Sequence, residues 1–186
     1  MSIIKEIATV RTGVYLKETP DGEAHYLQVK DFQNNALLLH TFPTLTINDK
    51  VAKYLLSEGD LLFAAKGFAN FCAVYRENWG TAVASSSFLV LKIKDKAKIL
   101  PEYLSWYLNR EDILFFFKNI TAGNVMPSIS KAMMENLEIS IPSVAVQRKI
   151  VQLDELCREE EALLEKIKIK RRELVQQTLI QIISKQ

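Results

Sequence analysis

The sequence predicts an α+β fold, in which a mixed globular domain over residues 1–143 is followed by one long C-terminal helix over residues 144–186. Two observations favour this fold. In the first 143 residues, short apolar runs bounded by turn residues are mixed with stretches of helical period, as in domains that combine strands and helices at irregular spacing. After Pro142 the helical period continues to the end without a Gly or Pro. Hydrophobic residues are 48% of the 186, enough to form a core.

The first half of the domain is expected to consist mainly of strands. A short helix or strand is expected over residues 3–10, a strand over residues 24–32, and a second apolar run over residues 36–42. The sequence LLFAA, which follows the turn residues Gly59-Asp60, predicts a short buried strand. Residues 87–93 are apolar on both faces, which is typical of a central strand.

The second half is expected to contain helices. Pro101 suits the first position of a helix, whose apolar residues recur at helical spacing as far as Phe115. Residues 118–130 predict a polar loop, and Ser130 is expected to cap a short helix that ends at Asn136. Residues 137–141 (LEISI) alternate between apolar and polar side chains, which predicts a half-buried strand.

The last helix is expected to span residues 144–184 and to be about 60 Å long at 1.5 Å per residue. Apolar residues recur along it at spacings of three and four, which indicates a heptad-like seam. The seam residues are Ile150, Leu153, Cys157, Leu164, Ile167 and Leu174, with the polar Glu160, Arg171 and Thr178 interspersed. A helix this polar gains little stability by itself and needs a partner for its apolar stripe. We therefore interpret it as an association helix. The alternative is that it folds back on its own domain.

Composition restricts the class of protein. The two cysteines, Cys72 and Cys157, form no pairing pattern, and neither a secretory signal nor a membrane-spanning run is present. A cytoplasmic protein without contact to membranes is therefore expected. Residues 144–186 carry nine Lys and Arg against seven Asp and Glu, so the first domain is neutral and the helix accounts for the net charge of +2. Charge alone does not indicate nucleic-acid binding.

Catalytic motifs are not found. The sequence has no Gly-rich phosphate loop and no nucleophile elbow. His25 and His40 lack neighbours at metal-ligand spacing. Asp60 and Lys66 suggest a nuclease metal site only superficially, since a second acidic residue at suitable spacing is not evident and Asp60 suits a turn. We therefore expect no enzyme activity, no metal and no other cofactor.

Three polar loops contain the candidate DNA-binding residues. Lys and Arg side chains can donate hydrogen bonds to phosphates and to guanine, and Asn can bond to adenine. The candidates are Lys66 and Gly67 in the first loop, Arg76, Asn78 and Trp79 in the second, and Asn119, Thr121 and Asn124 in the third. The alternative for each loop is that its side chains are simply solvated.

Taken together, these features resemble the target-recognition half of the DNA specificity subunit of type I restriction-modification systems. The resemblance covers essentially the whole chain. It rests on SEGDLLFAAKG (57–67), LPEYLSWYLN (100–109), the stretch from TAGNVMPSIS to LEISIPS (121–143), and QRKIVQLDEL (147–156). In that family a strand ending in Ile-Pro leads to a long helix that begins near a Glu-Gln pair. Gln147 matches this pair, whereas Val146 stands where Glu is usual, so half of a capping box is lost.

The resemblance implies a non-catalytic subunit that reads one half of a bipartite site in double-stranded DNA. Its partners would be adenine methyltransferase (modification) subunits and a restriction/translocase subunit. Because the full subunit has two recognition domains and two antiparallel spacer helices, this chain is expected to form a homodimer through an antiparallel coiled coil and to read an interrupted palindrome; a fragment of a longer subunit is the alternative. A coiled-coil adaptor that does not bind DNA, and a small nuclease, are the competing functions.

Overall fold

The computed structural model describes residues 2–33, 36–37, 42–67, 69–123 and 126–184. The chain divides into two units, residues 1–147 and residues 148–186, each of which is described by itself. The first unit is a mixed α/β domain and the second is the continuation of one long helix. The predicted fold class is thereby confirmed.

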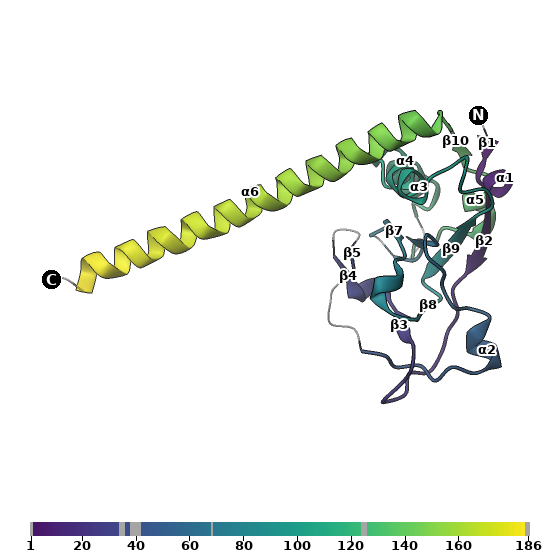
Figure 1. The fold of residues 1–186 in the computed structure, drawn as a ribbon, viewed down its shortest axis with the longest axis horizontal. Coiled ribbons are helices and arrows are strands. Elements are labelled where there is room, and N and C mark those ends of the chain that lie inside the picture. Colours follow the sequence, from purple (N-terminus) through teal and green to yellow (C-terminus); the bar gives the residue numbers. More distant parts are fainter. Residues whose placement is uncertain (1, 34–35, 38–41, 68, 124–125, 185–186) are drawn as a thin grey trace. The chain divides into compact units, whose positions relative to one another are not determined.

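Among the described residues of the first unit, the strands form one four-stranded sheet and three short pairs (Figure 1). In chain order the strands are β1 (Ser2–Ile3), β2 (Ala8–Thr12), β3 (His25–Leu27), β4 (Phe32–Gln33), β5 (Ala36–Leu37), β6 (Leu61–Ala64), β7 (Cys72–Val74), β8 (Ala82–Ala84), β9 (Phe88–Ile93) and β10 (Glu138–Ile139). The sheet has the order β2-β9-β6-β7 and is antiparallel throughout. As predicted, β9 is a central strand.

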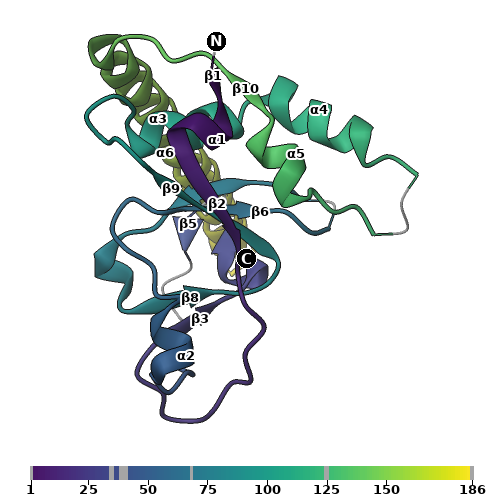
Figure 2. The same ribbon diagram turned by 90° about the vertical axis from the view of Figure 1, so that its right-hand side faces the viewer.

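The α-helices within the described residues are α1 (Ile4–Ile7), α2 (Asp49–Ala52), α3 (Pro101–Leu108), α4 (Glu111–Ile120), α5 (Lys131–Glu135) and α6 (Val144–Ser184). Helices α3, α4 and α5 gather at one end of the domain, and α2 lies with β3 and β8 at the other (Figure 2). The fully buried rings of Phe63 and Phe117, whose centroids are 5.5 Å apart, join α4 to the sheet.

Several short elements differ from the sequence prediction. Residues 3–10 contain β1, α1 and the first part of β2 rather than one element. The strand predicted over residues 24–32 is interrupted by a 3-10 turn at Val29–Asp31, because the Asp31 carboxylate accepts the Gln28 backbone N–H at 2.7 Å. Of the apolar run at residues 36–42, β5 forms the beginning, and residues 38–41 lie outside the described residues.

The helix predicted from Pro101 to Phe115 is two helices. The interruption lies at Asn109, whose side-chain oxygen accepts the Cys72 N–H at 2.8 Å and whose amide donates to the Cys72 carbonyl at 2.7 Å. Asn109 thereby bonds to the edge strand β7 as a neighbouring strand would, and the chain turns there before α4 begins at Glu111. The first residues of the predicted loop over 118–130 belong to α4.

The predicted strand and short helix before α6 are present. Ser130 caps α5 by accepting the Met133 N–H at 3.2 Å. Leu137 and Ile139 are buried while Glu138 and Ser140 are exposed, and β10 pairs with β1 at the other end of the domain sequence. Helix α6 then begins at Val144, where the Ser143 carbonyl accepts the N–H groups of Val146 and Gln147.

Candidate nucleic-acid interface

Loops from several parts of the chain meet at one end of the four-stranded sheet. Strands β2 and β6 finish there and β7 and β9 begin there, because Thr12 pairs with Leu89, Ala64 with Phe88, and Phe63 with Cys72. We call the loop residues at this end the strand-end surface, and it comprises residues 13–18, 65–67, 69–71 and 85–87 together with the end of α4 and its following loop (residues 118–123 and 126–129).

Backbone hydrogen bonds join the first and third predicted loops within this surface. The Gly67 N–H donates to the Pro127 carbonyl at 3.0 Å, and the Ile129 N–H donates to the Ala65 carbonyl at 2.9 Å. Gly67 has a φ of +95°, a left-handed conformation that glycine adopts without strain. Lys66 pairs with Ser128 in an isolated bridge and its side chain is exposed. Two loops whose joined residues are about 60 positions apart in the sequence therefore form one surface.

A cavity of about 220 Å³ lies between these two loops. Asn70 and Lys118 line it together with Gly67, Thr121 and Gly123. Lys118 is exposed and Asn70 is half-buried, with its amide donating to the Ala64 carbonyl at 2.8 Å. Neither Asn70 nor Lys118 was among the candidates from the sequence. The polar character of residues 118–130 was the signal that could have indicated Lys118, which lies next to the predicted Asn119. The sequence prediction did not recognise that the first residues of this stretch are helical.

The third loop has one exposed and one buried candidate. Asn119 is exposed on the last turn of α4. Thr121 is only 4% exposed, and its hydroxyl donates to the Phe117 carbonyl at 2.9 Å, so it stabilises the helix end. Asn124 lies outside the described residues. DNA contact by these three residues stays a prediction.

The second predicted loop lies beyond the other end of β7. The Arg76 guanidinium contacts the Glu58 carboxylate at 3.1 Å and the Glu102 carboxylate at 2.8 Å. The Glu77 backbone N–H and the Arg76 guanidinium together hold the pKa of Glu58 below its usual value. Trp79 is half-buried, with its ring centroid 5.9 Å from that of Phe32.

Only Asn78 of this loop is an exposed candidate. The ion pairs of Arg76 and the packing of Trp79 give these side chains structural roles, and the β6–β7 hairpin separates them from Lys66. DNA contact by the residues of this loop stays a prediction.

The seam residues of α6 are accessible along the second unit. Leu153, Leu164, Ile167 and Leu174 are 64%, 58%, 48% and 64% exposed, Cys157 is exposed, and Ile150 is half-buried. Leu156 and Leu163 are also exposed and widen the same apolar stripe. The second unit thus presents a long apolar face that a partner helix could cover.

The part of the chain that the structure describes contains no group of three or more His, Cys, Asp or Glu side chains placed to hold a metal ion. None of its helices combines the length and the apolar character that crossing a membrane requires.

Burial raises the pKa of the Cys72 thiol to about 12, and its Ser105 neighbour opposes this shift only in part, so the thiol stays protonated at neutral pH.

These features define a class of protein: a mixed α/β domain with polar loops at one end of a sheet, followed by a long helix with an apolar stripe. The family follows from comparison with known proteins. The chain belongs to the family of type I restriction modification DNA specificity domains, whose model matches residues 1–170. This confirms the resemblance seen in the sequence. Specificity subunits are non-catalytic, and the methylase and restriction activities reside in other subunits.

Solved structures share the fold. The S subunit of the type I restriction-modification system from M. genitalium has a TM-score of 0.60 and 16% identity, over 92% of this chain and 42% of that chain. The HsdS subunit from Thermoanaerobacter tengcongensis has a TM-score of 0.63 and 16% identity, over 89% and 38%.

A third match, to a chain in a structure of complex assembly and conformational transition of the type I R-M system, has a TM-score of 0.57 and 18% identity, over 88% and 39%. The present chain spans less than half the length of each of these three chains. A comparison with curated proteins found no match.

Proposed function

We propose that this chain reads one half of a bipartite DNA sequence and directs the modification and restriction subunits of a type I complex to it. The match of the DNA specificity domain over residues 1–170 carries this proposal. The strand-end surface supports it, because Lys66 is exposed there on a loop after β6, and Lys118 and Asn119 are exposed there on the last turn of α4. Exposed Lys suits phosphate contacts, and Asn suits the edge of adenine.

We further propose that the subunit works as a homodimer in the cytoplasm. The exposed apolar stripe of α6 would pair antiparallel with the same stripe of a second copy. Two-fold symmetry would place two identical recognition domains on the DNA, and the site would then be an interrupted palindrome. Adenine methyltransferase subunits and a restriction/translocase subunit would complete the assembly.

An exchange of the recognition domain tests this function. The chain is co-expressed with its adenine methyltransferase subunit, and the methylated sequences are read from the genomic DNA. We expect an interrupted palindrome, whose half-site changes when residues 1–143 are replaced by those of another specificity domain while residues 144–186 are kept. The unexchanged chain is the control. An unchanged methylated sequence after the exchange would contradict the proposal and favour an adaptor that does not bind DNA.

A further inference from the structure

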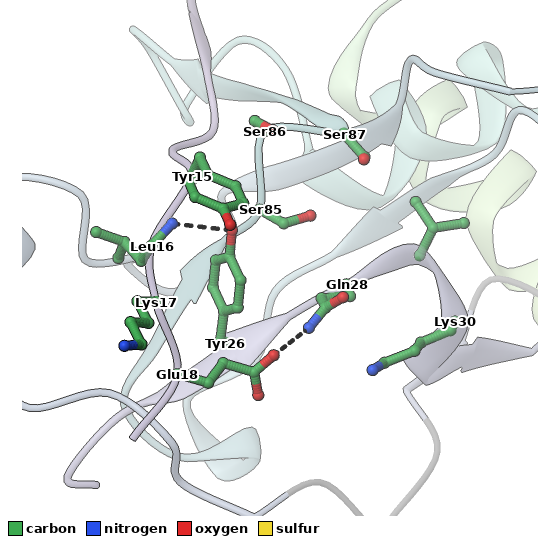
Figure 3. Close-up of a pocket in the computed structure, with 11 residues that line it drawn as sticks. Tyr15, Leu16, Lys17, Glu18, Tyr26, Gln28, Lys30, Ser85, Ser86 and Ser87 are labelled. Atoms are coloured by element: carbon green, nitrogen blue, oxygen red, sulfur yellow. Dashed lines mark hydrogen bonds between the residues drawn. The ribbon is translucent and has the colours of Figure 1, made fainter. Parts of the chain in front are cut away.

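A second hollow, of about 470 Å³, is lined partly by residues 15–18 and 85–87 of the strand-end surface, and none of the residues predicted from the sequence lines it (Figure 3). Its walls come from the segment after β2, from the end of β3 with its 3-10 turn, and from the turn at residues 85–87. The Ser87 carbonyl accepts the Ala65 N–H at 2.9 Å, so the turn lies directly beside the Lys66 loop. The hollow and the predicted loops therefore belong to one continuous surface.

The backbone around the hollow is held in place. The Tyr26 hydroxyl donates to the Val14 carbonyl at 2.8 Å and accepts the Leu16 N–H at 3.2 Å. Burial raises the pKa of Tyr26, so the hydroxyl stays protonated at neutral pH and can donate. A Cβ at Gly13 would lie 2.1 Å from the Ser85 carbonyl oxygen, so only glycine permits this approach of the two segments. Side chains on such a frame are presented in fixed positions.

A Gln–Glu pair lies within the hollow. The Gln28 amide donates to the Glu18 carboxylate at 2.6 Å, and the Gln28 backbone N–H is held by Asp31 at 2.7 Å. A glutamine amide has two N–H groups and one oxygen. The bond to Glu18 uses one N–H group of the amide. The second N–H group can donate to N7 of an adenine, and the amide oxygen can accept from its N6 amino group.

Two lysines flank this pair. Lys17 and Lys30 are both exposed, and Figure 3 shows them on opposite sides of Glu18 and Gln28. They come from different segments, one after β2 and the other after β3. This arrangement suits a duplex whose base edge faces Gln28 while the flanking phosphates contact the lysines. The same two cations would not suit an apolar or a cationic ligand.

We propose that this hollow is a base-reading subsite for duplex DNA, in which Gln28 contacts an adenine and Lys17 and Lys30 contact the adjacent phosphates. Glu18 is a positioning residue, because it orients the Gln28 amide. The inference rests on the proposed function and adds a contact surface to it. On this proposal, the turn between β8 and β9 and the segment after β2 help to determine which DNA sequence is recognised.

The test uses the full chain in complex with its methyltransferase subunit and measures methylation rates on duplexes that vary one base pair at a time. Gln28→Ala is expected to remove a preference of about 10- to 100-fold for A·T at one position while the other positions keep theirs. Glu18→Gln is expected to weaken the same position only. Circular dichroism verifies that each variant is folded.

Charge removal gives the second arm. Lys17→Ala with Lys30→Ala is expected to slow methylation of all sequences alike and to reduce the salt dependence by about one unit of slope per lysine. The matched control is Lys5→Ala with Lys92→Ala. Both lysines are exposed, Lys5 in α1 before β2 and Lys92 opposite Thr9 near the start of β2. This control should leave rates unchanged.

The outcomes separate the two proposals. If the wild-type complex methylates no defined sequence, the proposed function fails. If the wild-type complex does methylate a defined sequence, two results for Gln28→Ala overturn the base-reading role. One is that the base preference relaxes at no position; the other is that methylation of all sequences is slowed equally or lost completely. A control pair of lysines that has the same effect as Lys17 and Lys30 would remove the phosphate contacts from the proposal.

Discussion

Gln147 is a single residue that fixes the start of α6 to the domain. It is fully buried, although glutamine is rarely so. Its side-chain oxygen accepts the Leu100 N–H at 2.9 Å, and its amide donates to the carbonyls of Lys98 at 2.9 Å and Pro142 at 2.8 Å. One side chain thus satisfies backbone groups before α3 and before α6, which explains the value of Gln at this position even with Val146 beside it.

Replacing Gln147 with Ala is expected to lower the free energy of unfolding by about 3 kcal/mol, because three partly buried backbone groups lose their hydrogen-bond partners at about 1 kcal/mol each. Urea unfolding at fixed protein concentration measures this change. Gln152→Ala, at an exposed position of the same helix, is the control and should change stability by less than about 0.5 kcal/mol. Equal effects of the two substitutions would show that the hydrogen bonds of Gln147 are unimportant.

Asp60 is a buried carboxyl with a structural rather than a catalytic role. It is 2% exposed and accepts the Ser57 N–H at 3.0 Å, which closes the turn before β6. Burial raises its pKa above the ordinary value of 3.8, and the Ser57 N–H opposes this shift only in part. The folded protein therefore holds this proton more tightly than the unfolded chain does.

The consequence is a pH-dependent contribution to stability. The contribution of Asp60 is fully present below its unfolded pKa and is lost as the pH rises through its folded pKa. Asp60→Asn keeps an acceptor for Ser57 but does not titrate, so its stability relative to wild type should increase from about pH 4 to pH 7. Urea unfolding across this range measures the difference. A constant difference, or one that decreases with pH, would contradict the raised pKa.

At the scale of elements, the most informative patterns were those of β9 and α6. Residues 87–93 are apolar on both faces because β9 has neighbours on both sides, β2 and β6. By contrast, β7 (Cys72–Val74) and β8 (Ala82–Ala84) have only three residues each. Runs this short show no period, so their pairing partners, rather than their sequences, make them strands.

The association of α6 is a prediction at this scale. Replacing Leu153, Leu164 and Ile167 with Glu puts charges into the apolar stripe, so the dimer should dissociate and the mass from light scattering should halve. The control places Glu at Ala162, Ile169 and Gln176, which are exposed, seven residues apart and on the opposite face of the helix, and should leave the mass unchanged. An unchanged mass in the first variant would disprove the seam.

At the scale of the whole molecule, the neutral charge of the domain bears on how the proposed DNA recognition would work. The domain carries no net charge over residues 1–143, yet it belongs to a DNA specificity family. Non-specific affinity for DNA comes mainly from phosphate neutralisation. Our interpretation is that methyltransferase subunits supply much of that affinity, and that the lysines at the strand-end surface position the domain so that base contacts can select a sequence.

The sequence by itself determined the α+β class, the start of the long helix after Pro142 and the family, because these depend on local period, on turn residues and on the order of short motifs along the chain. It also indicated the Lys66 loop and the polar loop after α4. Only the tertiary structure decided that these two loops meet, that Arg76 and Trp79 lie beyond the other end of β7, and that Gln28 and Glu18 share a hollow. These relations depend on strand order and register, which join residues far apart in the chain and leave no local pattern.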